Sequence, residues 1–345
     1  MKIKIAQIHV WDKKNKGDVA IVMAAQELLK KYLGDIEIIE FPVEFLKQAD
    51  EKDIKRLNSC RLAVIGGGGI YYRYFMPYSV SVIKRIKIPI VVFGVGYVRE
   101  VGARALKPEE KKGIIFLNNQ AELVSVRDYY SKKFLAGNGV AGSAIKVIGD
   151  PAIFLDEQKC EFKNQNAKVK IGLNLNYSGW LGFGKRQRQI LRSYEKTARY
   201  FQEKYGAQIY YLLHHPSERV IIRELAVRDL VIIDFADLRR QKYVYSRLDL
   251  IIGMMLHSCV LAFGAGTPEI NVAYDIRNKN FARFIGFPEL SVELDDLRKG
   301  VLLKRAAEVF KNRDFYQERF TRRKQAVWEK HKAFLQEIKK IIFHL

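Results

Sequence analysis

The chain has 345 residues, which is too long for one ordinary core and suits two domains of about 150 residues each. Hydrophobic residues make up 48% of it, and 60 Lys and Arg against 38 Asp and Glu leave a formal net charge of +22. That charge fits nucleic acid, anionic lipid headgroups or phosphorylated substrates as partners. No zinc-finger spacing or RNP-type aromatic motif accompanies it, so we expect no nucleic-acid partner.

Short apolar strands, each followed by a Gly or Asp turn and a helical pattern, predict an α/β fold with parallel sheets. Strands are expected at 2–9, 36–40, 62–65, 90–94, 123–127 and 145–148, and the clearest helices of this half at 19–32 and 129–135. The second half repeats the plan, with strands near 169–174, 208–213, 230–234, 250–253 and 269–273. The polar stretch 149–166 predicts a junction between domains over 1–155 and 156–313.

The last segment, 314–345, has an amphipathic helical pattern in which apolar residues such as Phe320, Val327 and Phe334 alternate with Lys and Arg. A basic amphipathic helix can lie on an anionic membrane. It can equally pack its apolar stripe on the body of the protein and turn its charges to water. We favour packing, because helices of this pattern that pack on a domain are commoner.

The uncharged run from Leu250 to Pro268 reaches the length of a transmembrane candidate. Glycines, His257 and a threonine–proline pair interrupt it where a lipid-facing helix would be continuously apolar. The run therefore predicts a strand, a turn, a helix, a turn and a strand. The N-terminus shows strand-like alternation and no long apolar region before a small-residue cleavage site, so we expect no signal peptide and a cytoplasmic protein.

Three cysteines, Cys60, Cys160 and Cys259, are far apart and odd in number. They fit reduced, buried thiols better than a disulfide or zinc framework, and we expect no structural metal.

In open parallel sheets, ligands bind beyond the carboxyl ends of the strands, so the residues that follow each strand are the candidates for a site. The first such segment, NKGD, contains Asn15, Gly17 and Asp18. Asp18 is a candidate to cap the following helix, or to orient or deprotonate a substrate hydroxyl. The segment VIGGGGIYYR follows the third strand, and Gly67 and Gly68 within it can expose backbone N–H groups to an anion.

Three further segments carry cations or histidines. Arg127 and Asp128 lie at the end of a strand. Either Arg127 binds an anion while Asp128 caps the next helix, or the two residues form a surface ion pair. His214, followed by His215, is a candidate for proton exchange or an exposed histidine at a proline turn. His257 is expected at a turn beside Ser258 as the N-cap, where a helix N-terminus favours anionic ligands.

Taken in order, these segments resemble the polysaccharide pyruvyl transferase family. The resemblance covers about 2–279 and rests on the following motifs: NKGD at 15–18, VIGGGGIY at 64–71, GVGY at 94–97, SVRD at 125–128, GDPA at 149–152 and LHSCVLAFGAGTPEINVAYDIRNK at 256–279. It implies two Rossmann-like domains with parallel sheets facing a cleft, as in GT-B glycosyltransferases. It also implies transfer of the enolpyruvyl-derived unit of phosphoenolpyruvate to a sugar or lipid-linked sugar, usually as a pyruvate ketal, with no metal or other cofactor.

By this resemblance His257 is the first choice for acid–base work, and Asp18 for orienting or activating the acceptor hydroxyl. Arg127, Lys279 and the glycine turn with Gly67 and Gly68 are candidates to bind the donor's phosphate and carboxylate. Possible substrate contacts come from the following residues: Asn15, Gly17, His214 and Ser258. The basic surface is compatible with peripheral work at the inner face of the cell membrane.

One position departs from the family pattern. Where the family commonly has Arg-Leu-His, this chain has Met255, Leu256 and His257. Either Arg277 or Arg73 supplies the missing cation, or the donor differs, or activity has been lost. A GT-B glycosyltransferase that uses a nucleotide sugar and a non-catalytic descendant of such an enzyme are the alternative hypotheses.

Overall fold

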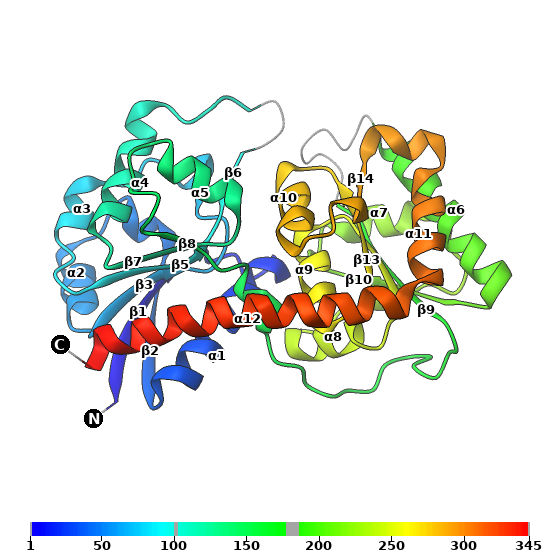
Figure 1. The fold of residues 1–345 in the computed structure, drawn as a ribbon, viewed down its shortest axis with the longest axis horizontal. Helices are drawn as coiled ribbons and strands as arrows, with labels where there is room; N and C mark the ends of the chain where they lie inside the picture. The colour runs from blue at the N-terminus through cyan, green and yellow to red at the C-terminus, as the bar shows by residue number, and fades with distance from the viewer. Residues whose placement is uncertain (1, 100–102, 177–185, 344–345) are drawn as a thin grey trace. The chain divides into compact units, whose positions relative to one another are not determined.

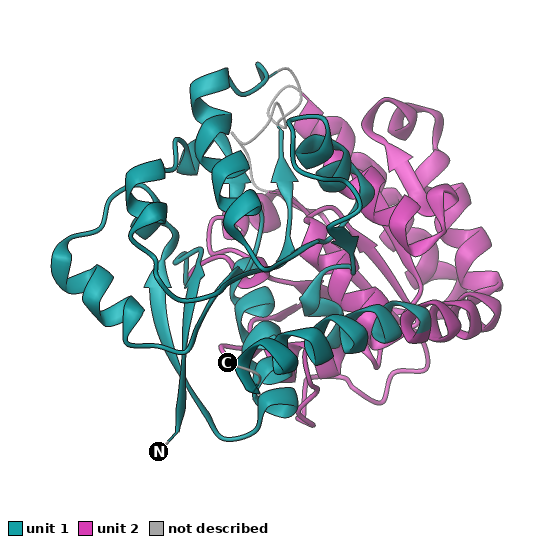
Figure 2. Cartoon of the chain, turned by 60° about the vertical axis from the view of Figure 1, so that its left-hand side comes forward, with its two compact units in different colours: residues 1–13, 18–154, 326–345 teal, residues 14–17, 155–325 magenta. Residues whose placement is uncertain are grey.

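The computed structural model describes residues 2–99, 103–176 and 186–343 (Figure 1). The chain forms two compact units, which are coloured separately in Figure 2. Unit 1 comprises residues 1–13, 18–154 and 326–345, and unit 2 comprises 14–17 and 155–325. The chain passes from one unit to the other at two places that matter for the site. In the NKGD segment, Gly17 belongs to unit 2 and Asp18 to unit 1, and the last helix has residues in both units.

Unit 1 contains a parallel six-stranded sheet of order β2-β1-β3-β5-β7-β8. Its strands are β1 (Ile3–His9), β2 (Ile36–Pro42), β3 (Leu62–Gly66), β5 (Ile90–Val95), β7 (Leu123–Val126) and β8 (Ile145–Val147). A small parallel pair joins β4 (Tyr71–Tyr72) to β6 (Tyr97–Val98). The helices are α1 (Lys16–Leu33), α2 (Glu51–Asn58), α3 (Val80–Lys84), α4 (Pro108–Gln120) and α5 (Tyr129–Ala136), with short 3-10 turns η1 (Val43–Leu46), η2 (Arg73–Phe75) and η3 (Pro151–Phe154).

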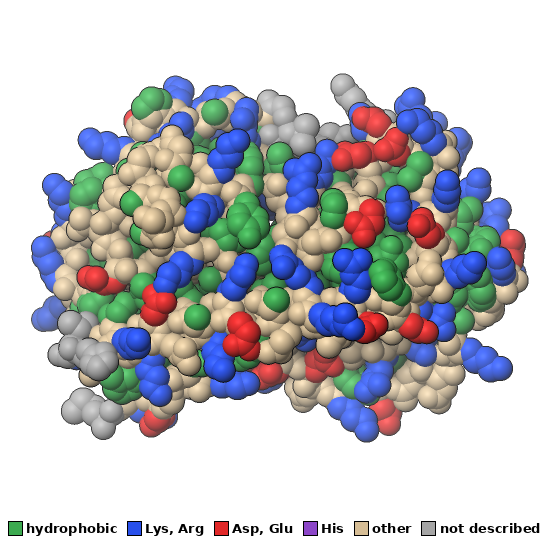
Figure 3. Space-filling model, in the orientation of Figure 1, with side chains coloured by type: hydrophobic (Ala, Val, Ile, Leu, Met, Phe, Trp, Pro, Cys, Tyr) green, Lys and Arg blue, Asp and Glu red, His purple; other side chains and the backbone are tan. Residues whose placement is uncertain are grey.

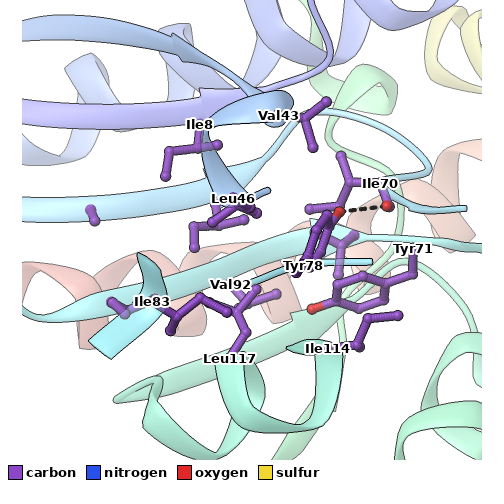
Figure 4. Packing of buried hydrophobic residues seen from close by; sticks show 14 of the residues in the cluster. Ile8, Val43, Leu46, Ile70, Tyr71, Tyr78, Ile83, Val92, Ile114 and Leu117 are labelled. Carbon is purple, nitrogen blue, oxygen red and sulfur yellow. Dashed lines mark hydrogen bonds between the residues drawn. The ribbon is translucent and has the colours of Figure 1, made fainter. Parts of the chain in front are cut away.

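The two faces of this sheet are covered by different helices, because successive side chains of a strand point to opposite faces. In β3, Ala63 and Ile65 join a core with residues of α2, α3 and α4. Figure 4 shows part of this core, where the Tyr78 hydroxyl donates to the Ile70 carbonyl oxygen at 2.6 Å. Leu62 and Val64 of the same strand join a second core with α1 and the C-terminal helix. Strands buried on both faces explain their nearly continuous apolar sequences.

Unit 2 contains a second parallel six-stranded sheet, of order β11-β10-β9-β12-β13-β14. Its strands are β9 (Lys170–Asn174), β10 (Gln208–Leu212), β11 (Val231–Ile233), β12 (Leu250–Gly253), β13 (Glu269–Ala273) and β14 (Ser291–Glu293). Its helices are α6 (Gln187–Tyr205), α7 (Glu218–Glu224), α8 (Leu238–Tyr245), α9 (Leu256–Ala265), α10 (Ile276–Ile285) and α11 (Val301–Lys311), with η5 (Pro288–Leu290) and η6 (Leu294–Lys299). The stretch 250–273, which begins with the uncharged run, is thus strand, helix and strand, as its turns predict.

The C-terminal helix α12 (Arg313–Phe343) carries the apolar stripe expected from the sequence, and its last two residues, 344 and 345, lie outside the described residues. In unit 2 its Phe320 ring packs edge-on against Phe263, with centroids 5.1 Å apart. In unit 1 its Phe334 ring stacks on Phe93 at 5.8 Å. Both α12 side chains are buried. Across the described residues, no helix is both long and apolar enough to span a membrane.

Replacing Phe334 with Ala should destabilise the protein by about 3 kcal/mol or more, because it removes a buried ring and leaves a cavity against Phe93. Guanidinium chloride unfolding monitored by circular dichroism measures the effect. The exposed Lys339→Ala change on the same helix is the matched control and should stay within about 0.5 kcal/mol of the wild type. Equal stabilities of the two variants would contradict the packing of α12.

Candidate functional site

In unit 2 the strand order reverses between β9 and β12. Connections that leave these neighbouring strands run in opposite directions, and ligands of doubly wound sheets bind at this point, beyond the carboxyl ends. Asn174, the last residue of β9, is fully buried here. Its Oδ1 accepts from the Met255 N–H at 2.9 Å, and its Nδ2 donates to the Leu212 carbonyl oxygen at 3.0 Å and to Glu218 at 3.1 Å. Asn174 therefore fixes the segment that leads into α9.

His257 lies in the first turn of α9, beyond the carboxyl end of β12, and is half-buried. The helix begins at Leu256 with Met255 in the N-cap position, so the expectation that Ser258 is the N-cap was wrong. The helix begins three residues earlier than the turn signals suggested, and Asn174 holds the N–H of its N-cap residue, Met255.

The NKGD segment brings two of the expected residues to His257. Asn15 precedes α1 and accepts a hydrogen bond from the Gly17 N–H at 3.0 Å, so Asn15 caps this helix. The expectation that Asp18 caps it was wrong, because the helix begins two residues earlier, at Lys16. A Cβ atom on Gly17 would lie 2.3 Å from His257 Nδ1. Glycine at this position leaves the space that the imidazole occupies.

Lys16 anchors this segment to the carboxyl edge of the unit 2 sheet. Its N–H donates to the His214 carbonyl oxygen at 2.9 Å, and its Nζ donates at 2.8 Å to both Asp234 and Gln241. Burial lowers the pKa of Lys16, against the opposing effect of the bond to Asp234. Lys16 lies within NKGD, but no sequence pattern indicates this anchoring role.

Behind His257 lies a chain of buried hydrogen bonds through two of the expected contacts. Tyr245 donates its hydroxyl hydrogen to Ser258 Oγ at 3.0 Å, and its oxygen lies 2.7 Å from His214 Nε2. The single tyrosyl hydrogen is thereby used, so His214 donates from Nε2. Burial lowers the pKa of His214 well below its ordinary value, so the ring is neutral. His214 is not the exposed histidine of the turn hypothesis, and neither it nor Ser258 reaches solvent.

Glu218 is a second buried group that sequence reasoning missed, although it lies just after His214 and His215. Its carboxyl group accepts from the Tyr211 hydroxyl at 3.0 Å and from the His214 N–H. Burial raises its pKa to about 8, although these hydrogen bonds act in the opposite direction. The group is mostly protonated at neutral pH and adds little charge to the interior.

Two of the expected cations, Arg277 and Lys279, follow β13, the strand next to β12 in unit 2. Asp275 follows β13, caps α10 through the Arg277 N–H at 2.9 Å and holds the Arg277 guanidinium at 2.8 Å. Lys279, a predicted anion ligand, pairs with Glu293 at 2.7 Å, so its charge already has a partner. Arg277 belongs to the same unit as His257, whereas Arg73 lies in η2 of unit 1.

In unit 1 the strand order reverses between β1 and β3, and the glycine turn follows β3. Gly67 and Gly68 have φ angles of +110° and +118°, which residues other than glycine rarely adopt. An Asp18 carboxylate oxygen lies 3.1 Å from where a Cβ atom on Gly68 would be. The structure thus brings Asp18 and this turn together within unit 1.

Arg127 lies beyond the carboxyl end of β7 and is only 5% exposed, so it does not form the surface pair of the alternative hypothesis. Its guanidinium lies 3.5 Å from both Asp128 and Asp150 and packs on Gly96, where a Cβ would be 2.3 Å from Nε. Within the described ranges, its Nη2 has no hydrogen-bond partner, and a Cβ on Gly69 would lie 3.8 Å from it. A buried cation with an unused donor beside a glycine turn is suited to an anionic ligand.

Exposed aromatic side chains follow two strands of unit 1 at this same edge. Trp11, after β1, is 43% exposed and stacks on His9 at 5.3 Å. Tyr74, in η2 after β4, is 74% exposed and stacks on Tyr72 at 6.4 Å. No sequence pattern marks these rings as site residues.

Two parallel α/β units with reversed strand order define a GT-B-like architecture, and comparison with solved structures agrees. UDP-GlcNAc 2-epimerase from Neisseria meningitidis, bound to UDP-GlcNAc, matches with a TM-score of 0.62 at 14% identity, over 98% of this chain and 100% of that one. The S. aureus MnaA–UDP structure gives 0.62 at 15% identity, over 93% and 91% of the two chains. Anabaena Alr3699/HepE, in complex with UDP and glucose, gives 0.57 at 12% identity, over 99% and 100%.

The sequence itself matches the family model described as polysaccharide pyruvyl transferase over residues 15–276. The chain therefore belongs to the polysaccharide pyruvyl transferase family, as the ordered motifs predicted. No curated protein matches the sequence.

The raised pKa of Glu218 predicts a pH-dependent stability. Between the ordinary glutamate pKa of about 4.3 and the folded value of about 8, the folded state binds more protons than the unfolded state. The stability that protonated Glu218 contributes to the folded state is therefore lost as the pH rises through that window. Glu218→Gln should flatten the fall of unfolding free energy by up to about 1.4 kcal/mol per pH unit. Urea unfolding at a series of pH values tests this, with exposed Glu203→Gln as control. A slope unchanged from the wild type would refute the buried neutral acid.

Gly17→Ala should displace the His257 ring, because the added methyl group would overlap Nδ1. NMR of ¹³C-labelled histidines reports the displacement as shifted His257 signals, assigned by their loss in His257→Gln. Gly142→Ala is the matched control, since a Cβ there meets its nearest neighbour at an ordinary 3.6 Å. Unmoved His257 signals in Gly17→Ala would show that the contact is not present in solution.

Proposed function

We propose that this protein transfers a pyruvyl group from phosphoenolpyruvate to a sugar of a cell-surface polysaccharide or its lipid-linked precursor. Membership of the pyruvyl transferase family supports the transferase class. The observation that carries the donor assignment is the buried Arg127, whose Nη2 lacks a hydrogen-bond partner within the described ranges, beside the glycine turn of unit 1. Phosphoenolpyruvate offers a phosphate and a carboxylate, and arginine binds both groups bidentately.

The reaction requires one proton at the enol carbon and removal of a proton from each of two acceptor hydroxyls. Protonation of C3 makes C2 electrophilic, and the first hydroxyl oxygen bonds to C2. The C2–O bond to phosphate then breaks, phosphate leaves with one proton, and the second hydroxyl closes the ketal. Protons balance, since of the two that leave the hydroxyls one replaces the proton given to C3 and the other leaves with phosphate.

We assign the proton transfers to His257, whose ring is half-buried at a helix N-terminus in unit 2. The chain of His214, Tyr245 and Ser258 packs beneath that turn, and we assign it to positioning rather than to substrate contact. In unit 1 Asp18 orients an acceptor hydroxyl, and the exposed rings of Trp11 and Tyr74 offer flat apolar surfaces to a sugar.

The family's cation beside the histidine is replaced here by Met255, and we propose Arg277 as its substitute. Arg277 belongs to the same unit as His257 and follows the strand next to β12. Asp275 fixes its guanidinium in place. Arg73 lies in η2 of the other unit.

Thermal unfolding with phosphoenolpyruvate, and separately with UDP, tests the donor, because a ligand that binds only the folded state raises the melting temperature. We expect stabilisation by phosphoenolpyruvate and at least tenfold weaker binding in Arg127→Ala, since a charge-assisted hydrogen-bonded pair contributes about 1.5–3 kcal/mol. Arg127→Lys keeps the charge opposite the buried carboxylates and loses the planar fork, so it separates recognition from folding. Stabilisation by UDP alone would overturn the donor and favour a nucleotide-sugar glycosyltransferase.

A further inference from the structure

A cationic hollow of about 500 Å³ lies in unit 2, away from the residues assigned above. It is formed by the first half of α6, by η6 and by the start of α11, which pack together (Figure 1). α6 and η6 come after the carboxyl ends of β9 and β14, so the hollow belongs to the functional edge of this sheet.

One wall of the hollow is a row of cations on α6. Arg188, Arg192 and Lys196 are spaced four residues apart, so they lie on one face of the helix about 6 Å from one another along its axis. All three are exposed. From η6, Arg298 lines the hollow and donates from Nε to the neutral Gln189 side chain at 2.8 Å.

The acidic residues of η6 do not neutralise this row. Asp295 pairs with Arg186 at 2.8 Å, and Asp296 pairs with Lys299 at 2.9 Å. No Asp or Glu is among the described residues that line the hollow, and no described carboxylate forms an ion pair with the three cations on α6. Lys and Arg are spread over the face shown in Figure 3, with Asp and Glu among them.

We propose that the hollow binds a multiply charged phosphate group, such as a diphosphate. Four cations line one hollow, so they suit a ligand with more negative charge than the single charge of a carboxylate. Arginine also matches phosphate geometry through its paired N–H donors. The same chemistry is offered by a free diphosphate and by a phosphorylated lipid headgroup. The site is separate from donor binding by Arg127 and does not depend on the proposed reaction.

Titration calorimetry with inorganic pyrophosphate and sedimentation with vesicles that contain phosphatidic acid, whose phosphomonoester headgroup can carry two negative charges, distinguish the two sources. The test variant is Arg188→Ala/Arg192→Ala. Lys339→Ala/Lys340→Ala is the control, because it also removes two positive charges from exposed positions of a helix. Arg127→Ala separates this site from the donor site.

If the ligand is a free diphosphate, we expect the test variant to bind pyrophosphate at least tenfold more weakly than the wild type. The control and Arg127→Ala should then bind it as the wild type does. Salt-sensitive sedimentation that is lost in the test variant and kept in the control identifies a lipid headgroup. Equal behaviour of the test and control variants in both assays overturns the site. Pyrophosphate binding that is lost only in Arg127→Ala also overturns it, because the phosphate then occupies the donor site.

Discussion

The reversal of strand order in each parallel sheet is the constraint on which the candidate site depends. At this point two neighbouring strands send their connections in opposite directions, and the edge between them is left without a crossing segment. In unit 2 the backbone groups exposed there still need hydrogen-bond partners. The Asn174 side chain supplies partners to the Leu212 carbonyl oxygen at the end of β10 and to the Met255 N–H before α9, and it also donates to the Glu218 side chain, which sets where α9 begins and where His257 projects.

Buried charge is handled differently behind His257 and around Arg127. Behind His257 the buried groups shed charge: burial lowers the pKa of His214 and raises that of Glu218 to about 8. Such a network avoids the cost of desolvating ions while keeping its hydrogen bonds, so it holds the histidine turn rigidly. In unit 1 the buried Arg127 guanidinium lies 3.5 Å from both Asp128 and Asp150. This difference is the physical basis for assigning proton transfer and anion binding to different units.

Membership of the family fixes the class of reaction more firmly than its donor. The solved structures share the fold at 12–15% identity, and the nucleotides bound in them are ligands of those proteins. In this chain Met255 stands beside the histidine, Lys279 pairs with Glu293, and exposed aromatic rings follow β1 and β4.

The sequence by itself determined the α/β class, most strands to within a residue or two, the strand–helix–strand character of 250–273 and the family. These follow from local periodicity and from glycines at turns, which act over short distances along the chain. Only the tertiary structure decided that Asn15 rather than Asp18 caps α1, that Arg127 and His214 are buried, and that Lys16 and Glu218 belong to the site. A strand-end rule names the residues near an edge, but burial and pairing depend on side chains from distant segments. Gly17 and His257 are 240 positions apart, so no local pattern could show that one makes room for the other.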